Sequence, residues 1–368
     1  MNTRRTNTAK WYENQNRWQI KVMKNGIRKT FTSSKPGRTG QREANAKADA
    51  WLESGMISEK KRVHQLYVDF LEDVKVRTST GNYVNLESIG RVWVLPKIGY
   101  MKIDDLNLQI LQDVINFAAK KGRSKKTLSN IRGALSAFLH YLRKRGYTML
   151  RCDDIELPNS APVGKRNILQ ADALKVLMTS DMTTFRSKPI RDFYIHAYRF
   201  LVLTGLRPGE LCELNERNQK QTDKICVSGS YNRFKEHTSG KTENAKRTFL
   251  LSKYAQEELK AQKNMLKRMG IISPWLFPDK DGSQLFSGTL LHHWKKYQAA
   301  NGLEGITTYE LRHTFVSLCQ NAVPENLIKS VVGHSSKMPT YETYGHELNS
   351  DAETANRLIN YVFTEILD

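Results

Sequence analysis

The chain has 368 residues, of which 39% are hydrophobic, so it is long enough for two or three domains with well-packed cores and is not a disordered chain. Its 58 lysines and arginines outnumber 37 acidic residues, and the net charge of +21 implies an acidic partner, with nucleic acid as the first candidate. No apolar run approaches the roughly 18 residues of a membrane span, and no signal peptide opens the sequence, so we expect a cytoplasmic protein. The 4 cysteines lack metal-site spacing, which argues against a zinc module.

The first 56 residues predict a small appended module with a net charge of +8. Residues 10–33 alternate aromatic and β-branched residues with polar ones around an Asn25-Gly26 turn, which predicts a β-hairpin in a small three-stranded sheet. A helix over 41–54 should cover this sheet with its small and apolar residues, which are Ala44, Ala48, Trp51 and Leu52. The module suits a DNA groove, although its tryptophans could equally form its core.

Residues 57–158 predict a compact all-helical domain. Apolar positions recur at helical spacing over four segments, which are 58–75, about 85–95, 107–120 and 125–145. Two cationic clusters fall at helix ends, where they could contact phosphates: Lys120, Lys121, Arg123, Lys125 and Lys126, and then Arg143, Lys144 and Arg145. Isolated runs of this kind are usually solvated faces.

A linker at 152–166 loses this periodicity, and we place a boundary near 160 before a larger third domain. Helices at about 170–178 and 189–203 should lead to a turn at 204–207 and a helix that opens at Pro208, which pins the backbone of Arg207. Further elements should be strands at 226–231 and 247–252 around a polar loop at 233–246, and helices at 252–269 and 287–299.

Residues 306–346 bring an arginine, three histidines and several tyrosines together in and directly after two short helical runs, which indicates a phosphate site. Tyr309 and Arg312 are i, i+3 neighbours that can share a ligand, whereas His313 lies about 100° further round the helix and should point elsewhere. The second run stops at Gly333, so His334 should directly follow a helix end.

Five motifs now carry a resemblance. TGLRPGEL (204–211), the lysine loop that ends in KRTFLL, ELRHTF (310–315), VVGHSS (331–336) and TYGH (343–346) resemble the ordered motifs of the tyrosine recombinases, a family that includes integrases of phages, prophages and conjugative transposons. The resemblance implies a multidomain fold: an α+β arm-binding module at 1–56, an all-α core-binding domain at 57–158, and a mainly α catalytic domain at 159–368 with a C-terminal docking helix.

DNA cleavage through such a site needs donors for the phosphate oxygens, an acid for the leaving 5′ oxygen and a nucleophile. Arg207 and Arg312 suit the first role because guanidinium groups stay charged and match phosphate oxygens, although Arg207 could instead form an ion pair with Glu210. The resemblance implies that Lys241 is the acid and that His334 contacts the phosphate. Lys235 and Lys246 in the same loop remain alternatives for the acid.

Tyr344 is the nucleophile that the resemblance implies, and Tyr341 is the alternative. A tyrosine is only about 0.1% ionised at pH 7, so it depends on nearby cations to stabilise its phenolate. Most relatives carry a histidine where this chain has Tyr309, which cannot buffer a proton near pH 7. The helical phase of His313 makes it a poor substitute, so a base at this place is in doubt.

The function that we expect is site-specific recombination through a 3′-phosphotyrosine, without metal, ATP or another cofactor. Its partners should be double-stranded core and arm DNA sites, other copies of the chain in a tetramer on DNA, and an excisionase or a host DNA-bending protein. A type IB topoisomerase would not need the N-terminal module, and a non-catalytic DNA-binding regulator would not need five ordered motifs. The apolar face of 352–367 should pack on a neighbouring protomer, as in relatives, or on its own domain.

Overall fold

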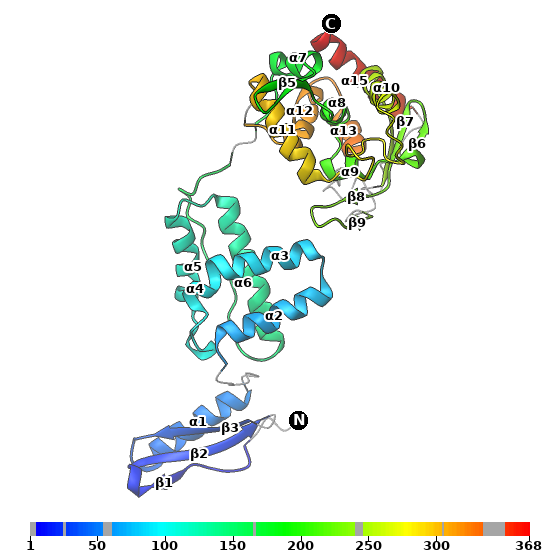
Figure 1. The fold of residues 1–368 in the computed structure, drawn as a ribbon. Helices are drawn as coiled ribbons and strands as arrows, with labels where there is room; N and C mark the ends of the chain where they lie inside the picture. Colours follow the sequence, from blue (N-terminus) through cyan, green and yellow to red (C-terminus); the bar gives the residue numbers. More distant parts are fainter. Residues whose placement is uncertain are drawn as a thin grey trace. The chain divides into compact units, whose positions relative to one another are not determined.

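The computed structural model describes residues 5–24, 27–53, 61–164, 167–239, 246–303, 305–333 and 350–368. The chain divides into two compact units, residues 1–164 and 165–368 (Figure 1). The first unit contains two separate hydrophobic cores, one in its N-terminal module and one among its helices, and the second unit contains a third core. The fold is therefore mostly helical with small sheets. Within the described ranges, no helix is both long and apolar enough to cross a bilayer.

The N-terminal module is a three-stranded antiparallel sheet covered by one helix. Strands β1 (Lys10–Tyr12), β2 (Arg17–Lys24) and β3 (Ile27–Ser33) lie in the order β1-β2-β3. Helix α1 (Gly37–Glu53) begins four residues before the predicted start, and its buried side chains are those expected: Ala44, Ala48, Trp51 and Leu52. Trp51 is therefore a core residue of this module.

The rest of the first unit is helical, as its apolar periodicity predicted. Its helices are α2 (Val63–Arg77), α3 (Thr80–Ile89), α4 (Leu95–Ile98), α5 (Leu108–Lys120) and α6 (Lys125–Lys144). The helix predicted at about 85–95 is present but extends from Thr80 to Ile98, because a π-helical turn at Gly90–Val94 joins α3 to α4. Gly90 lies against the Tyr67 ring, and an added Cβ would be 2.2 Å from that ring.

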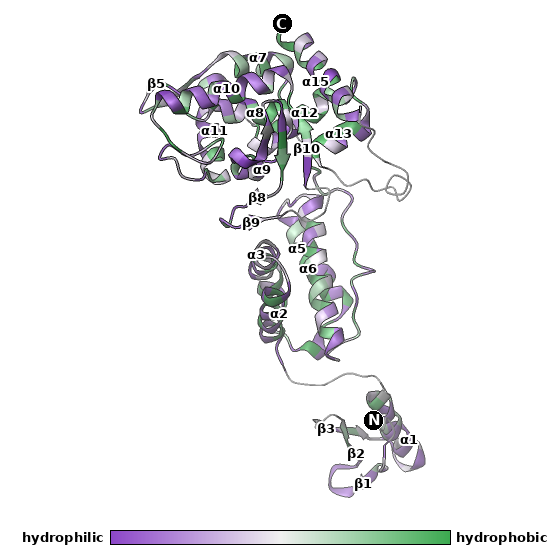
Figure 2. Cartoon of the chain, turned by 90° about the vertical axis from the view of Figure 1, so that its right-hand side faces the viewer, coloured by the Kyte–Doolittle hydropathy of each residue, from purple (hydrophilic) through white to green (hydrophobic). Residues whose placement is uncertain are grey.

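The second unit packs its helices around one core in which α8 is buried along almost its whole length. Figure 2 shows α8 beside α12 in the interior of this unit, with hydrophobic residues in green. The helices are α7 (Ala171–Thr179), α8 (Ile195–Thr204), α9 (Pro208–Glu213), α10 (Lys253–Arg268), α11 (Ser287–Asn301), α12 (Thr308–Cys319), α13 (Glu325–Val332) and α15 (Asp351–Leu367).

The predicted helix at 189–203 is wrong at its start. A hairpin of β4 (Met182–Phe185) and β5 (Lys188–Arg191) occupies that region, and α8 begins only at Ile195. The two turn residues, Arg186 and Ser187, both have positive φ values, 50° and 62°. Two-residue hairpin turns of this hand normally use Asn or Gly, so the sequence carried no turn signal here.

The predicted strands near the polar loop are present but belong to two small sheets. Strands β6 (Gln219–Gln221), β7 (Lys224–Val227) and β10 (Arg247–Leu250) form one sheet, in the order β10-β7-β6. Strands β8 (Ser230–Tyr231) and β9 (His237–Thr238) form a second hairpin, which places a strand inside the predicted loop.

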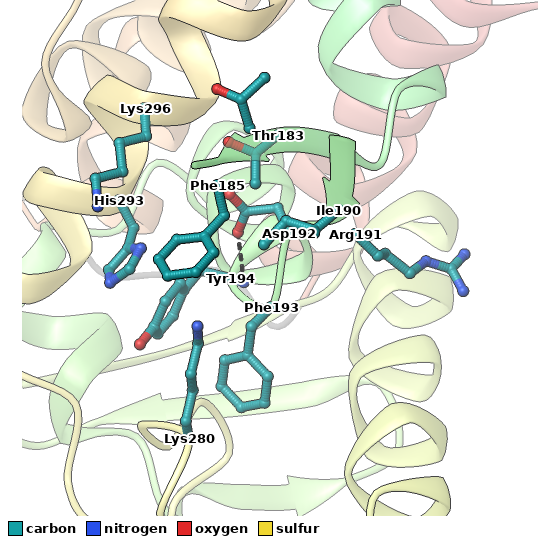
Figure 3. A pocket seen from close by; sticks show the side chains of 11 residues that line it. Thr183, Phe185, Ile190, Arg191, Asp192, Phe193, Tyr194, Lys280, His293 and Lys296 are labelled. Atoms are coloured by element: carbon teal, nitrogen blue, oxygen red, sulfur yellow. Dashed lines mark hydrogen bonds between the residues drawn. The ribbon is translucent and has the colours of Figure 1, made fainter. Parts of the chain in front are cut away.

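A small hollow of about 70 Å³ lies between the β4–β5 hairpin, the start of α8 and α11 (Figure 3). The buried Asp192 carboxylate accepts a hydrogen bond from the Tyr194 backbone N at 2.7 Å, and burial raises the pKa of Asp192 to about 6. Lys280, His293 and Lys296 line the opposite side. None of the residues that line this hollow is a predicted site residue.

Helix α15 packs on its own unit in this single chain, which is one of the two alternatives for its apolar face; docking on a neighbouring protomer stays a prediction. Phe363 is 0% exposed and stacks on Phe315 of α12, with ring centroids 6.3 Å apart. The Asn360 side chain accepts a hydrogen bond from the Lys253 backbone N at 2.7 Å. The apolar face of this helix therefore completes the core of the chain that carries it.

Replacing Phe363 with alanine should lower the free energy of unfolding of the second unit by about 3–5 kcal/mol, because it leaves a cavity in that core. Tyr361→Ala is the matched control: its side chain is 58% exposed, and it should cost less than about 0.5 kcal/mol. Urea unfolding followed by circular dichroism measures both. If the two variants were equally stable and Phe363→Ala assembled more weakly on DNA, the result would support docking of α15 on a neighbouring protomer.

Candidate functional site

The residues on either side of Arg207 fix the conformation of its backbone. Helix α8 ends at Gly205, whose φ is +65°, and a Cβ on Gly205 would be 2.5 Å from the Phe315 ring. Arg207 is then the N-cap of α9, and Pro208 occupies the first helical position, where its fixed φ suits the helix. The predicted turn and helix start are confirmed, and together they aim the Arg207 side chain.

The alternative ion pair between Arg207 and Glu210 is present. Arg207 Nη1 lies 2.7 Å from Glu210 Oε1, and the Arg207 backbone N donates to Glu210 Oε2 at 2.9 Å. Glu210 is buried, and the neighbouring guanidinium groups of Arg247 and Arg207 hold the pKa of its carboxyl below its usual value against the opposing effect of burial. The Arg207 side chain nevertheless stays 33% exposed, so the ion pair leaves room for a ligand.

Arg312 is the most buried cation of the site. It comes from α12, is 1% exposed, and donates from Nη1 to the Gly205 carbonyl at 2.8 Å. Its Nη2 is buried and has no hydrogen-bond partner in the described part of the chain. Burial, together with the neighbouring Arg207, lowers the pKa of Arg312 to about 10, so the group stays charged at neutral pH. A buried charged donor without a partner is costly, which indicates a place for an acceptor from outside.

Arg247 belongs to the same cluster, although we did not predict it. It is the first residue of β10, and its Nη2 lies 2.9 Å from Glu210 Oε2. It also donates from Nε to the Val331 carbonyl at 2.6 Å. The cluster of Arg207, Arg247 and Arg312 with Glu210 therefore holds three positive charges and one negative charge, which suits a doubly charged anion or a phosphodiester under attack.

Tyr309 and His313 are closer to each other than the helical phase implied. Tyr309 is 44% exposed at the first turn of α12, and its ring lies edge-on to the His313 ring with centroids 5.3 Å apart. The expectation that His313 points away from Tyr309 is therefore wrong, because residues four apart on a helix share a face. Whether Tyr309 and Arg312 bind one ligand stays a prediction.

Three predicted site residues, Lys241, His334 and Tyr344, lie outside the described residues, as does Tyr341. The segment directly before His334 is described. Helix α13 ends at Val332, and Gly333 caps it with a φ of +68°. The predicted helix end directly before His334 is therefore confirmed.

The two alternative lysines for the acid are described, and both are exposed. Lys235 lies in the turn before β9 with its ammonium 5.8 Å from the Phe286 ring centroid. Lys246 directly precedes β10. In the described ranges, no group of His, Cys, Asp and Glu side chains has a metal-binding arrangement.

Known proteins are similar to this chain in sequence. Residues 167–350 match the phage integrase family. A tyrosine recombinase XerC-like protein of Caldanaerobacter subterraneus subsp. tengcongensis is 23% identical over 378 residues, which cover 92% of this chain and 92% of that protein.

Two solved structures share the fold. The Tn1549 transposon integrase in complex with transposon right end DNA has a TM-score of 0.62 at 20% identity, over 80% of this chain and 98% of that one. A lambda integrase tetramer bound to a Holliday junction has a TM-score of 0.58 at 17% identity, over 92% of this chain and 95% of that one.

Proposed function

Since the chain belongs to the phage integrase family and is a tyrosine-type site-specific recombinase, we propose that it integrates and excises a mobile DNA element through a 3′-phosphotyrosine intermediate. The observation that carries the proposal is the Arg312 guanidinium, which is buried beside Arg207 with Nη2 unpartnered in the described ranges. Two guanidinium groups from α12 and the start of α9 can hold the non-bridging oxygens of one scissile phosphate.

In the proposed reaction, the Tyr344 hydroxyl loses its proton to solvent water as its oxygen attacks phosphorus, and the bond from phosphorus to the 5′ oxygen breaks. Lys241 donates a proton to that leaving oxygen, which departs as a 5′ hydroxyl. His334 donates a hydrogen bond to the phosphate, and Tyr309 stands where most relatives carry a histidine. The phosphotyrosine keeps one phosphodiester bond, so a 5′ hydroxyl of another strand can reverse the step without ATP, metal or another cofactor.

We propose that residues 1–56 bind arm sites, that 57–158 bind the core site and that 159–368 carry the chemistry. Five cations at the α5–α6 connection support the core-binding role because all are exposed: Lys120, Lys121, Arg123, Lys125 and Lys126. Two residues of the second predicted cluster, at 143–145, already have partners within the protein. Arg143 donates to the Leu150 carbonyl at 2.8 Å, and Arg145 pairs with Asp73 at 3.3 Å.

The proposed partners are double-stranded DNA and three further copies of the chain. The DNA complexes formed by the similar integrases, including the lambda tetramer, support this assembly. An excisionase or a host DNA-bending protein would set the direction of the reaction. The recombinase itself would act on chromosomal DNA in the cytoplasm.

The polarity of the covalent bond tests the proposed chemistry. The protein is incubated with a nicked duplex that carries the element junction, so that a short 5′-hydroxyl fragment diffuses away after cleavage. The expected product is protein on the 3′ side, together with a fragment whose 5′ end polynucleotide kinase labels without prior phosphatase treatment. Protein attached to a 5′ end, or cleavage only in the presence of a divalent metal ion, would contradict the proposal.

The open face of the N-terminal sheet supports a second DNA site. Strand alternation places Ile20 and Val22 toward α1, so Lys21 lies on the opposite face. Lys21 pairs with Thr30, and Met23 pairs with Arg28, which brings further polar and basic residues to this face. The face therefore presents cations at adjacent strands, where a duplex backbone could lie.

Replacing both Lys21 and Arg28 with serine should weaken binding to arm-site DNA and lower the salt slope of that binding by about two, since each lost phosphate contact contributes about one. Core-site cleavage should stay unchanged. The matched control replaces Arg38 and Arg42, which are exposed on α1, and removes the same charge from the covering helix. Fluorescence anisotropy at several salt concentrations measures both; equal losses would show only a net-charge effect and remove the proposed face.

A further inference from the structure

The largely buried side chain of Arg247 connects three elements of the site, β10, α9 and α13. Its side chain is 7% exposed, and its two Nη atoms lie 3.2 Å and 2.9 Å from the two oxygens of Glu210. This is the two-pronged geometry in which a guanidinium group holds a carboxylate most firmly. Its Nε donates to Val331 in the last turn of α13, so one side chain ties β10 to α9 and α13.

The same two anchors also hold Arg207. Arg207 also contacts both oxygens of the Glu210 carboxylate, through its backbone N at 2.9 Å and its Nη1 at 2.7 Å. Arg207 Nη2 donates to the Gly333 carbonyl at 3.3 Å. Two guanidinium groups thus share one buried carboxylate and bind neighbouring carbonyls at the C-terminal end of α13, which carries the negative end of the helix dipole.

We infer that Arg247 is a positioning residue for strand cleavage, which fixes the Arg207 guanidinium through the shared Glu210 carboxylate and holds the helix end from which His334 follows. The inference rests on the proposed function. The exposed fractions of the two side chains distinguish phosphate binding from positioning. Arg207 is 33% exposed and can contact a phosphate, whereas Arg247 is 7% exposed and acts on Arg207 through Glu210.

The charges give a reason for the arrangement. Arg207 and Glu210 alone would cancel, and the pair would offer a phosphate little net attraction. Arg247 neutralises the carboxylate, so the positive charge of Arg207 remains available. Without Arg247 the full negative charge of Glu210 acts on Arg207 and draws its guanidinium toward the protein interior. Arg247 is also the first residue of β10 and lies six positions after Lys241 in the sequence.

The test compares Arg247→Met with Arg199→Met in the full-length protein. Arg199 is the matched control because its side chain is also 7% exposed and paired, with Asp181 at 2.7 Å. Both substitutions should lower the melting temperature. Only Arg247→Met should slow single-turnover formation of the covalent adduct at saturating DNA, by about 10-fold to 100-fold, because misplacing a catalytic group by about 1 Å costs that much. The Kd for core DNA should change less than about twofold.

A second comparison separates positioning from general destabilisation. In an Arg207→Ala background, Arg247→Met should slow adduct formation by a clearly smaller factor than in the wild-type background, since the guanidinium that it positions through Glu210 is gone and only its contact with α13 remains. A merely structural role predicts the same factor in both backgrounds, and that result would overturn the inference. If Arg247→Met does not fold, Arg247→Lys replaces it, keeping the charge but not the two-pronged contact. Failure of the wild-type protein to form any adduct would instead contradict the proposed function.

Discussion

Tyr344→Phe is expected to abolish the covalent complex with a nicked suicide duplex while the protein still binds that duplex. The substitution removes only the hydroxyl oxygen that becomes bonded to phosphorus, so no other residue can complete the same step at the same place. The expected loss exceeds about 10⁴-fold, which is the scale for removal of an essential nucleophile. Denaturing gel electrophoresis of labelled DNA measures the adduct, and a mobility shift assay measures binding.

Tyr341→Phe is the matched control because it makes the same change three residues earlier. It should form the adduct at close to the wild-type rate. Adduct that persists in Tyr344→Phe and disappears in Tyr341→Phe would move the nucleophile to Tyr341. Loss in both variants, together with lost binding, would indicate damage to the segment rather than to the chemistry.

Local signals were enough to predict the position of Arg207. A glycine that ends one helix and a proline that opens the next are readable in the sequence, and the structure has both in place, with Arg207 as N-cap. The helix end before His334 was readable for the same reason, since Gly333 adopts a positive φ after α13. The amphipathic helices of the first unit were also predictable, because their apolar residues recur at helical spacing.

Contacts between distant segments were not readable. Arg247 meets Glu210 and Val331, which lie 37 and 84 residues away, so only the folded chain brings them together. Arg247 lies within the motif KRTFLL, but no local pattern in that motif indicates that its side chain contacts Glu210. The complete burial of Arg312 was equally hidden, because a charged residue on a helix is normally expected at the surface.

The hairpin of β4 and β5 was not predicted from the sequence, because its turn uses Arg186 and Ser187, which are not typical residues for positive φ. The position of α15 illustrates a different limit. An apolar helical face predicts burial, but the same face fits its own unit or a second copy of the chain. Phe363 stacks on Phe315 of the same chain, and only a folded structure could show that contact.

Arg312→Lys is expected to slow adduct formation by about 10²-fold to 10³-fold, although it keeps the positive charge, because it removes a placed donor to the transition state. In the wild-type protein, Nη1 binds the Gly205 carbonyl at 2.8 Å and leaves Nη2 for a phosphate oxygen. A single ammonium group cannot hold both positions of this fork. Single-turnover cleavage of the suicide duplex measures the loss, and Arg217→Lys, an exposed exchange in the same unit, should leave the rate unchanged.

The rate of adduct formation should also depend on pH differently in Arg312→Lys and in the wild-type protein. Burial lowers the pKa of Arg312 to about 10, so the wild-type site keeps this charge up to about pH 9 and loses it as the pH rises through 10. A lysine in the same place starts from a reference pKa of only about 10.4, and the same burial lowers it further, so its charge is lost at a lower pH. Adduct formation by Arg312→Lys should therefore fall between about pH 7 and 9, where the contribution of Arg312 in the wild-type protein is constant. Equal pH profiles with equal rates would mean that Arg312 supports the fold through Gly205 and does not bind the phosphate.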